Sequence, residues 1–443
     1  MERREVFQLG VTGALGAALA ARPLAAQEQE ARATRGLPTP IIKDIKVIAT
    51  QPQYARLIVV KVITDQPGLY GYGCGTFTQR ADLVIPAVEK YLKPLLVGMP
   101  TDRIEDTWQA AYNSSYWRNG PVLNNAISGV DQALWDIKGR QANMPVYQLL
   151  GGKAREAAVT YATIGSTDAS QAVDRVHQMM DQGFKVVKVM VGVPGMDAYG
   201  PRSGPAFKGL HSGPVFDPAP YMRLTQKVME QCRQQLGEEI GLIHDVHERV
   251  TPHEAVQFAK DLEPLRLFYL EDPLPPEHID YFRQIREHCT TSIAMGELFN
   301  NPHEWQPLIE GRLIDYIRCH VSQIGGLTPA HKVAILAQAY GVKTAWHGPP
   351  DVSPVGHTAQ LHLDLASRNF GIQEGGIIRG LEAEIFQGCA TFKDGYLWAS
   401  DKPGWGIEVD EALAAKHPFH DIRNNLNGGW GVIRWPDGTV INQ

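Results

Sequence analysis

Three short stretches decide the fold of this chain: HDVH at residues 244–247, YLEDP at residues 269–273 and MGE at residues 295–297. Their acidic residues Asp245, Glu271 and Glu297 each end a segment typical of a buried strand, and 26 residues separate each acid from the next. A strand and its following helix take about that many residues. The spacing therefore predicts adjacent parallel strands that each present one carboxylate at the same height.

Around these stretches, short apolar segments alternate with helical ones from near Val159 to about Gly375. The expected strands lie at 185–191, 241–247, 267–272, 292–297, 315–320, 342–347 and 370–374. One of the intervening helices is expected to start at Thr251-Pro252 and to run to Leu262. This alternation indicates a parallel barrel or a doubly wound sheet. Because no Gly-x-Gly-x-x-Gly follows the first strand, the dinucleotide-binding form of such a sheet is disfavoured.

The residues before this region predict a separate α+β domain at 41–150. Its expected elements are strands at 45–50 and 56–64, a Gly-rich turn through Gly71, Gly73 and Gly75, and a helix at 121–142. The barrel region then spans 151–375, and a C-terminal segment spans 376–443. An insertion at 192–220 is rich in Gly and Pro and is long enough to be an active-site loop.

The N-terminus has the order of an export signal. Arg3-Arg4 precedes an uncharged run from Val6 to Ala21, and the small residues Ala25-Ala26 follow. The arginine pair favours a twin-arginine signal over a Sec signal or a retained anchor. We therefore predict a signal peptide at 1–27, a flexible lead-in at 28–40, and a periplasmic or secreted protein.

Composition and charge disfavour several classes of protein. The 443 residues are 44% hydrophobic and 20% charged, which is ordinary for a globular chain of about two or three domains. The net charge is −6 and Lys and Arg are scattered, so nucleic acid is not an expected partner. Beyond the N-terminal run no segment is long and apolar enough to span a membrane. The five cysteines are widely spaced without a Cys-x-x-Cys pair, so they predict neither a zinc site nor an obvious disulfide framework.

The three acidic residues point to a metal ion. In parallel barrels the active site lies at the C-terminal ends of the strands. Three carboxylates converging there, with positions left for water or substrate, suit Mg²⁺, with Mn²⁺ as a possible substitute. A single acid in such a place would more often cap a helix or pair with a cation, but three in register favour Asp245, Glu271 and Glu297 as metal ligands.

Several motifs resemble the mandelate-racemase branch of the enolase superfamily, in particular mannonate dehydratase and its acid-sugar dehydratase relatives. The motifs are YWRNGPV, DQALWDIKGRQANMPVYQLLGGK, HDVHERVTPHEA, LEPLRLFYLEDP, GELFN, LIDYIR, GGLTP, HGPPDVSP, NFGIQE and PDGT. They cover nearly all of residues 41–443. The resemblance implies an α/β fold, a modified TIM (β/α) barrel with an α+β capping domain built from the N-terminal region and the C-terminal segment. It also implies that the three acids bind Mg²⁺.

The resemblance further implies a base and an acid for removing the proton beside a carboxylate and expelling a hydroxyl. His247 matches the general acid, and strand alternation from Asp245 would point both side chains into the barrel mouth. Tyr199 matches the base. The arginine that lowers the pKa of this tyrosine in the relatives is replaced by Lys188, which acts through the same charge but without a planar fork.

Other positions separate dehydration from racemisation. Where the racemases have a second lysine this chain has Met190, and where they have an Asp that pairs with a His on the next strand it has His320 beside His347. Both racemase bases are therefore altered, which favours dehydration. Asp351, Glu374 and Arg318 are the expected substrate contacts, and His347 is the expected further catalytic residue.

We therefore predict a Mg²⁺-dependent sugar-acid dehydratase, similar to mannonate dehydratase, which forms a 2-keto-3-deoxy acid. One alternative is an epimerase or cycloisomerase of a sugar acid or lactone that uses Lys188 and His347. Another is a non-catalytic periplasmic acid-sugar binding protein, because Lys188, Thr163 and Pro349 depart from the dehydratase pattern. The expected partner is a small acid sugar, and the chain is expected to form a homo-oligomer.

Overall fold

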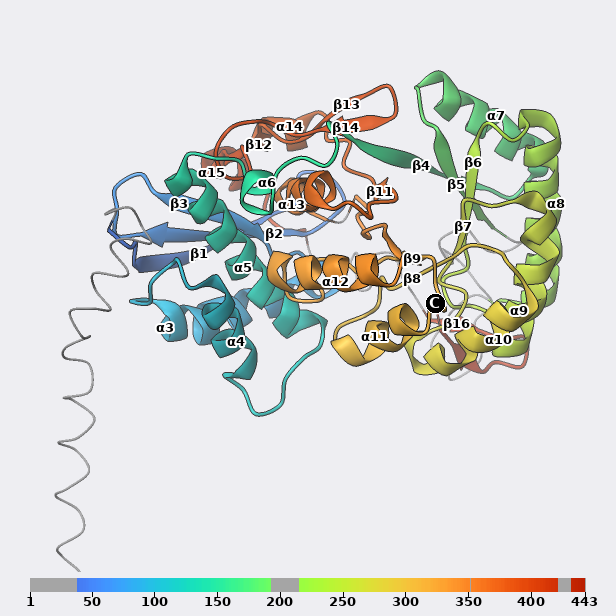
Figure 1. Ribbon diagram of the computed structural model, residues 1–443, viewed down its shortest axis with the longest axis horizontal. Coiled ribbons are helices and arrows are strands. Elements are labelled where there is room, and N and C mark those ends of the chain that lie inside the picture. Colours follow the sequence, from blue (N-terminus) through green and yellow to red (C-terminus); the bar gives the residue numbers. More distant parts are fainter. Residues whose placement is uncertain (1–37, 193–214, 351, 421–431, 443) are drawn as a thin grey trace, which may run out of the picture.

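The structure of the protein, a computed structural model, describes residues 38–192, 215–350, 352–420 and 432–442. An α+β domain lies beside a barrel, at the left and right of Figure 1. The predicted signal peptide, the lead-in up to residue 37, the candidate base Tyr199 and the candidate substrate contact Asp351 lie outside the described residues. None of the helices in the described ranges is both long and apolar enough to cross a bilayer.

The α+β domain is built on an antiparallel sheet in the order β1–β2–β3. The strands are β1 (Ile42–Thr50), β2 (Leu57–Thr64) and β3 (Tyr70–Cys74), and the helical elements are η1 (Thr78–Arg80), α2 (Ala81–Pro86), η2 (Ala87–Leu92), α3 (Lys93–Leu96), α4 (Ile104–Asn113), α5 (Pro121–Ala142) and α6 (Val146–Leu149). The predicted helix at 121–142 is confirmed. Its buried residues Ile127, Val130, Leu134 and Ile137 join the apolar core beneath the sheet.

The prediction of a Gly-rich turn through Gly71 and Gly73 is wrong, because these glycines lie in β3. Their role is packing against α5. A Cβ on Gly71 would stand 2.1 Å from the carbonyl oxygen of Ala133, and one on Gly73 would stand 2.1 Å from that of Gly129. The glycines therefore let the strand and the helix backbone approach more closely than any side chain would allow.

The barrel is a ring of parallel strands. Strands β4 to β10 pair in sequence order, a bridge joins Thr344 to Phe370, and β11 returns to pair with β4. The strands are β4 (Ala158–Ser166), β5 (Val186–Val191), β6 (Gly241–Asp245), β7 (Tyr269–Glu271), β8 (Ile293–Met295), β9 (Tyr316–Ile317), β10 (Lys343–Thr344) and β11 (Gln373–Glu374). The predicted barrel with an α+β cap is therefore the observed fold, and the doubly wound alternative is not.

Helices cover the outside of the ring. They are α7 (Ala169–Asp181), α8 (Pro218–Leu236), α9 (Pro252–Leu262), α10 (Phe282–His288), α11 (Pro302–Glu310), α12 (Leu327–Ala339) and α13 (Pro354–Ala366), with short turns η3 (Glu263–Leu265) and η4 (Pro276–Tyr281). Helices α7 to α10 lie at the right of Figure 1, and α12 and α13 lie on the side of the α+β domain. The predicted helix from Thr251-Pro252 to Leu262 is confirmed as α9, whose Thr251 and Glu254 form a capping box. After the last strand comes only the five-residue helix α14 (Leu381–Ile385), so the barrel is a modified one.

The strands are shorter than the sequence predicts. The regular strand in 241–247 ends at Asp245, and that in 267–272 runs from Tyr269 to Glu271. Isolated backbone hydrogen bonds continue past these ends, and the backbone becomes left-handed there, with φ of 52° at His247 and 39° at Asp272. Beyond these points the chain turns to form the rim of the barrel.

The C-terminal segment divides between the two parts. It contains α14 (Leu381–Ile385), β12 (Phe386–Gln387), β13 (Thr391–Lys393), β14 (Tyr396–Trp398), β15 (Glu408–Val409), α15 (Glu411–Ala414), β16 (Ile433–Arg434) and β17 (Val440–Ile441). Residues around β15 and α15 bind the cap, where Glu408 and Glu411 pair with Arg140 and Lys61. The hairpin β13–β14 instead extends the barrel sheet, because β14 pairs with β4. The expected completion of the cap thus describes only part of the segment.

The cap is fixed to the barrel by buried polar contacts. Both carboxylate oxygens of Asp131 on α5 accept hydrogen bonds from Thr328 on α12, at 3.0 Å from the backbone nitrogen and 2.5 Å from the hydroxyl. Trp135 donates to the same hydroxyl at 3.0 Å.

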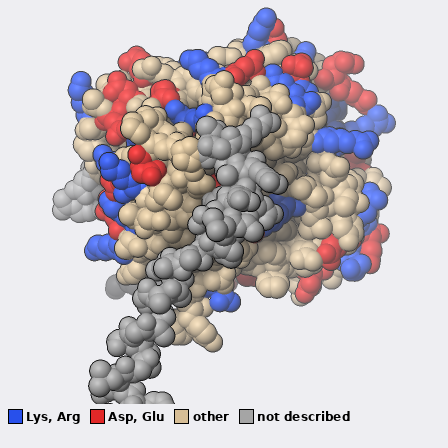
Figure 2. Space-filling model, turned by 60° about the vertical axis from the view of Figure 1, so that its left-hand side comes forward, with Lys and Arg blue, Asp and Glu red and all other residues tan. Residues whose placement is uncertain are grey.

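On the face shown in Figure 2, Lys and Arg lie among Asp and Glu rather than in one patch.

Candidate active site

The floor of the site is a layer of side chains inside the barrel. Each of the eight strand segments contributes one residue to it, and together they form one buried cluster: Tyr161, Val186, Ile243, Tyr269, Ala294, Tyr316, Ala345 and Ile372. Side chains two residues further along a strand point the same way, one layer higher. The apolar floor therefore defines which residues enter the barrel mouth.

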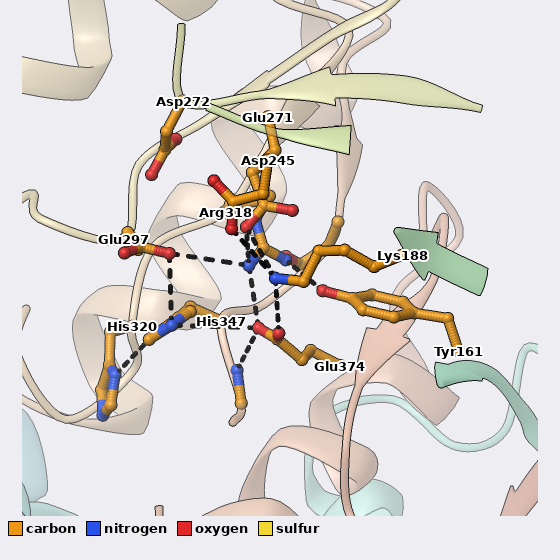
Figure 3. A network of polar contacts seen from close by, with 12 residues as sticks. Tyr161, Lys188, Asp245, Glu271, Asp272, Glu297, Arg318, His320, His347 and Glu374 are labelled. Atoms are coloured by element: carbon orange, nitrogen blue, oxygen red, sulfur yellow. Dashed lines mark hydrogen bonds and ion pairs between the residues drawn. The ribbon is translucent and has the colours of Figure 1, made fainter. Parts of the chain in front are cut away.

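Six of the predicted site residues stand two positions after a floor residue: Lys188, Asp245, Glu271, Arg318, His347 and Glu374. Asp245 and Glu271 are direct register partners on β6 and β7, as the spacing predicts. Glu297 departs from the ladder, because β8 ends at Met295 and Gly296 turns the chain with φ at 139°. Its carboxylate enters from the loop after the strand. Figure 3 shows these side chains converging on one region.

Lys188 lies in the middle of the acidic groups. Its Nζ is 2.9 Å from Glu374 Oε1, 3.1 Å from Asp245 Oδ2 and 3.2 Å from Glu271 Oε1 (Figure 3). Burial by itself would lower the pKa of this lysine, but the surrounding carboxylates raise it well above its usual value. Lys188 is therefore a protonated ammonium group in this arrangement.

Arg318 is the second buried cation. Its Nη2 is 2.5 Å from Glu271 Oε1 and 2.8 Å from Glu374 Oε2, and its Nη1 donates to the hydroxyl of Tyr161 at 3.2 Å. The side chain is fully buried. Arg318 thus joins two acids from opposite sides of the ring and fixes their orientation.

The acidic groups outnumber these two cations. Burial raises the pKa of Glu271, with Arg318 opposing the rise and Asp245 adding to it, and burial together with Asp272 and Asp245 raises the pKa of Glu297. Asp245 shows the opposite balance, because His247 and Lys188 outweigh burial and lower its pKa. The mouth therefore gathers more carboxyl groups than its buried cations can neutralise, and an added cation would favour their ionised forms.

The donor atoms fit a divalent cation. Asp245, His247 and Glu297 can each offer one ligand atom, and these atoms all lie within 4.8 Å of one another. Glu271 Oε1 is held by cations, whereas its Oε2 is buried and has no hydrogen-bond partner among the described residues. Carboxylate oxygens are the ligands that Mg²⁺ prefers. Two of the predicted metal ligands, Asp245 and Glu297, thus lie together with His247. Glu271 is joined to Asp245 through Lys188, which contacts both.

His247 reaches the site by a different route from the predicted one. It lies in a left-handed turn after β6 rather than on the strand. Its Nε2 is nevertheless 3.0 Å from Asp245 Oδ2, and its backbone nitrogen donates to Asp245 Oδ1 at 3.1 Å. Arg249 Nη2 stands 3.4 Å from His247 Nδ1. The turn therefore anchors the imidazole beside the carboxylate.

His347 and Glu374 complete the opposite side of the mouth. His347 Nε2 is 3.2 Å from Glu297 Oε2, and its Nδ1 is 2.8 Å from His320 Nδ1. Glu374 Oε2 accepts from the backbone nitrogen of Gly348 at 3.1 Å. His320, which the sequence marks as standing in the place of an Asp, is thus in direct contact with His347.

Sequence reasoning did not identify three other polar residues of the mouth. Tyr161 contacts Arg318, and its place in the floor layer is a signal that the strand pattern contains. Glu248 and Asp272 are buried, and each has one carboxylate oxygen with no partner among the described residues. Burial raises the pKa of Glu248 to about 9. Asp272 follows the predicted metal ligand Glu271, and Glu248 follows His247. The burial of both depends on left-handed turns that the sequence does not reveal.

A barrel whose mouth gathers the three predicted metal ligands Asp245, Glu271 and Glu297, beside an α+β cap, is typical of a class of metal-dependent enzymes. The description "Mandelate racemase / muconate lactonizing enzyme, N-terminal domain" matches residues 33–151, and "Enolase C-terminal domain-like" matches residues 171–413. The chain belongs to the mandelate racemase and muconate lactonizing enzyme branch of the enolase superfamily.

The chain is similar to several named proteins of this branch. A D-galactonate dehydratase family member of Enterococcus gallinarum is 49% identical, over 90% of this chain and 98% of the relative. Another, from Musicola paradisiaca, is 48% identical with the same coverage. A crystal structure of an enolase from Pantoea ananatis with bound D-gluconate and Mg is 45% identical, with a TM-score of 0.86 over 91% of this chain and 100% of that one.

Proposed function

We propose that this protein is a Mg²⁺-dependent sugar-acid dehydratase that removes water from an aldonic acid to give a 2-keto-3-deoxy acid. The observation that supports this most directly is the convergence of Asp245, Glu271 and Glu297 on one mouth, beside two imidazoles and two buried cations. The relatives point the same way, since they are named for D-galactonate dehydratase and one was crystallised with D-gluconate and Mg. The enzyme is accordingly a hydro-lyase, its cofactor is Mg²⁺ and its substrate is an acid sugar.

The residues of the barrel mouth then have distinct roles in the proposed reaction. The metal ion, when bound, neutralises the charge that forms on the substrate carboxylate as the neighbouring proton leaves. Asp245, Glu271 and Glu297 would hold that ion. Lys188 and Arg318 fix the orientation of Glu271 and Glu374, since they contact both, and this keeps the mouth preorganised.

The proton steps are assigned to His247 and Tyr199. His247, held beside Asp245, is placed to give a proton to the leaving hydroxyl as general acid. Tyr199 remains the proposed base. Asp351 remains a proposed contact to the substrate.

The alternative of an epimerase or cycloisomerase requires Lys188 to accept a proton. Its Nζ lies within 3.2 Å of three carboxylates, which hold it in the charged form. A lysine in that state has no lone pair to offer. These three contacts of Lys188 therefore favour dehydration over epimerisation or cycloisomerisation.

The identity of the sugar acid is a separate proposal. Mannonate is the substrate that the sequence motifs suggest, whereas the relatives above are named for galactonate or contain gluconate. We propose that the substrate is a six-carbon aldonic acid and keep mannonate as one member of the panel to be tested. We also propose export by the twin-arginine route, which fusion of residues 1–40 to a reporter and its loss on Arg3→Lys, Arg4→Lys substitution would test.

The decisive experiment incubates residues 28–443 and Mg²⁺ with a panel of aldonic and aldaric acids and detects 2-keto acids. We expect activity that is lost in Glu271→Gln and His247→Asn. Glu105→Gln is the matched control, because Glu105 is an exposed carboxylate of the α+β domain that pairs with Lys332 on the surface. Activity that survives Glu271→Gln, or a product that keeps the mass of the substrate, would contradict the proposal.

A further inference from the structure

One amide group of the α+β domain bridges two loops of the barrel mouth. Asn124, in the first turn of α5, is buried, and its Nδ2 is 2.7 Å from the backbone oxygen of Gln323 and 2.9 Å from that of Asn300. Gln323 lies in the loop after β9, and Asn300 lies in the loop after β8. The same nitrogen is 3.1 Å from Asn119 Oδ1. A backbone oxygen only accepts hydrogen bonds, so the side chain faces both loops with its NH₂ group.

The loop after β8 carries the predicted metal ligand Glu297. Asp245 and Glu271 are register partners on paired strands. Glu297 instead lies beyond the end of β8, in a turn that is closed by a 3.1 Å hydrogen bond from the Phe299 nitrogen to the Gly296 oxygen. The place of its carboxylate in the mouth therefore depends on the contacts that hold the two ends of this turn.

Different parts of the fold hold these two ends. At the start of the turn, the Gly296 nitrogen donates to Asp272 Oδ1 at 3.1 Å, which is a contact within the barrel. Just after the turn, the Asn300 nitrogen donates to Glu304 of α11, and the Asn300 oxygen accepts from Asn124. Of these three contacts, only that of Asn124 comes from the α+β domain. The α+β domain therefore reaches the turn of the metal ligand through one side chain.

The loop after β9 is held by the same side chain. The Gln323 nitrogen donates to the oxygen of His320 at 2.9 Å, which closes a turn, and the Gln323 oxygen accepts from Asn124. An amide NH₂ group has two hydrogens in a fixed plane, and its two shortest contacts are to the two loops. The geometry of one amide therefore sets the distance between the two loops.

We propose that Asn124 is a positioning residue for the metal site, because its amide holds the turn that contains Glu297 at a fixed place beside the loop after β9. The part of this proposal that concerns metal binding rests on the proposed function, whereas the joining of the loops follows from the contacts themselves. Loss of an outer partner of a metal ligand weakens metal binding by about 10- to 100-fold. Asn124 acts through the backbone and not on the carboxylate, so we expect the lower end of this range.

The next residue of α5 supplies a matched control. Asn125 is also buried, and its Nδ2 donates to the oxygen of Pro121 at 2.7 Å. That acceptor belongs to α5 itself and not to a loop of the barrel mouth. The Oδ1 atoms of Asn124 and Asn125 are both buried without a partner among the described residues. Asn124→Leu and Asn125→Leu therefore remove equivalent amides, and only the first releases the two loops.

The first measurement is Mg²⁺ binding to the protein by calorimetry, without substrate. We expect the Kd to rise about 10-fold in Asn124→Leu and to stay within about 2-fold of the wild type in Asn125→Leu. An unchanged Kd in Asn124→Leu, or an equal rise in both variants, would overturn the proposal. If a Leu variant does not fold, Asn124→Ala and Asn125→Ala form the same matched pair, with the same expected outcomes.

The second measurement is hydrogen exchange followed by mass spectrometry, in EDTA, on peptides that cover residues 296–301 and 320–326. We expect both peptides to exchange about 10-fold faster in Asn124→Leu, because two hydrogen bonds that hold the loops are lost, and to match the wild type in Asn125→Leu. Exchange as slow in Asn124→Leu as in the wild type would refute the joining of the loops. A wild type that binds no Mg²⁺ would refute the metal part of the proposed function, and the exchange rates would still decide whether Asn124 holds the loops.

Discussion

Replacing Lys188 by Met should destabilise the metal-free protein strongly. The substitution keeps an apolar side chain of similar length and removes an ammonium group that contacts Glu374, Asp245 and Glu271 at 2.9 to 3.2 Å in a fully enclosed setting. Breaking a buried ion pair from one side costs about 3–5 kcal/mol, because the remaining buried charges lose a counter-charge. With an unfolding entropy of about 2.1 cal/mol/K for each of roughly 400 residues, this corresponds to a fall in Tm of about 4–6 °C.

Magnesium should restore much of this loss. A cation that binds only the folded state stabilises it by about 2.7 kcal/mol at 100 times its Kd. The carboxylates that Lys188 no longer neutralises should make the Mg²⁺-dependent rise in Tm larger in Lys188→Met than in the wild type. Thermal denaturation followed by circular dichroism, in EDTA and then in excess Mg²⁺, measures both quantities.

The matched control is Lys332→Met, because Lys332 pairs with Glu105 at 2.6 Å on the surface, where both side chains are more than half exposed. An exposed pair contributes little to stability. The reasoning fails if Lys188→Met and Lys332→Met have the same Tm in EDTA, or if Mg²⁺ raises the Tm of Lys188→Met by less than that of the wild type.

Three further outcomes are expected. Burial raises the pKa of Asp131 to about 7 despite its hydrogen bonds from Thr328, so the folded state holds this proton more tightly than the unfolded state does. The stability that this proton contributes is complete below pH about 4 and is lost as the pH rises through 7, by up to about 4 kcal/mol relative to Asp131→Asn. Urea unfolding at pH 4, 6 and 8 can measure this loss. Gly73→Ala should lower the unfolding free energy by about 3 kcal/mol, since its Cβ would stand 2.1 Å from the carbonyl oxygen of Gly129. A soluble, equally stable variant would contradict the packing described here. Glu297→Gln should weaken Mg²⁺ binding in calorimetry with little change in Tm in EDTA, because burial already favours the protonated form of Glu297 without the ion, and unchanged affinity would argue against Glu297 as a ligand.

The sequence predicts the barrel well because its signals are local. Each strand is a short apolar run, and helices such as α9 begin at a capping box. The alternation of these signals indicates the ring. The sequence does not show which part of the fold the C-terminal segment packs against. The hairpin β13–β14 joins the barrel sheet through its pairing with β4, and no local pattern distinguishes that pairing from one with the cap.

The site follows the same division. Asp245 and Glu271 can be predicted from the spacing of the strand ends, whereas Lys188, Arg318, His347 and Glu374 are expected from the family resemblance. In the structure all six stand two residues after the floor layer. Glu297 and His247 reach the site through turns, so their arrival depends on the backbone angles at Gly296 and at His247 itself. The burial of Glu248 and Asp272 is set by neighbours from other strands and has no counterpart in the sequence pattern.

The pairing of β4 has a consequence for how the chain acquires its structure. Residues 158–166 leave the ribosome early, yet their partners on one side are Gln373–Glu374 and Tyr396–Trp398, more than 200 residues later. Contacts of such long range slow the formation of a fold, because the loop between them must close first. The first barrel strand therefore keeps an open edge during most of synthesis, and the barrel can close only after nearly the whole chain has been made.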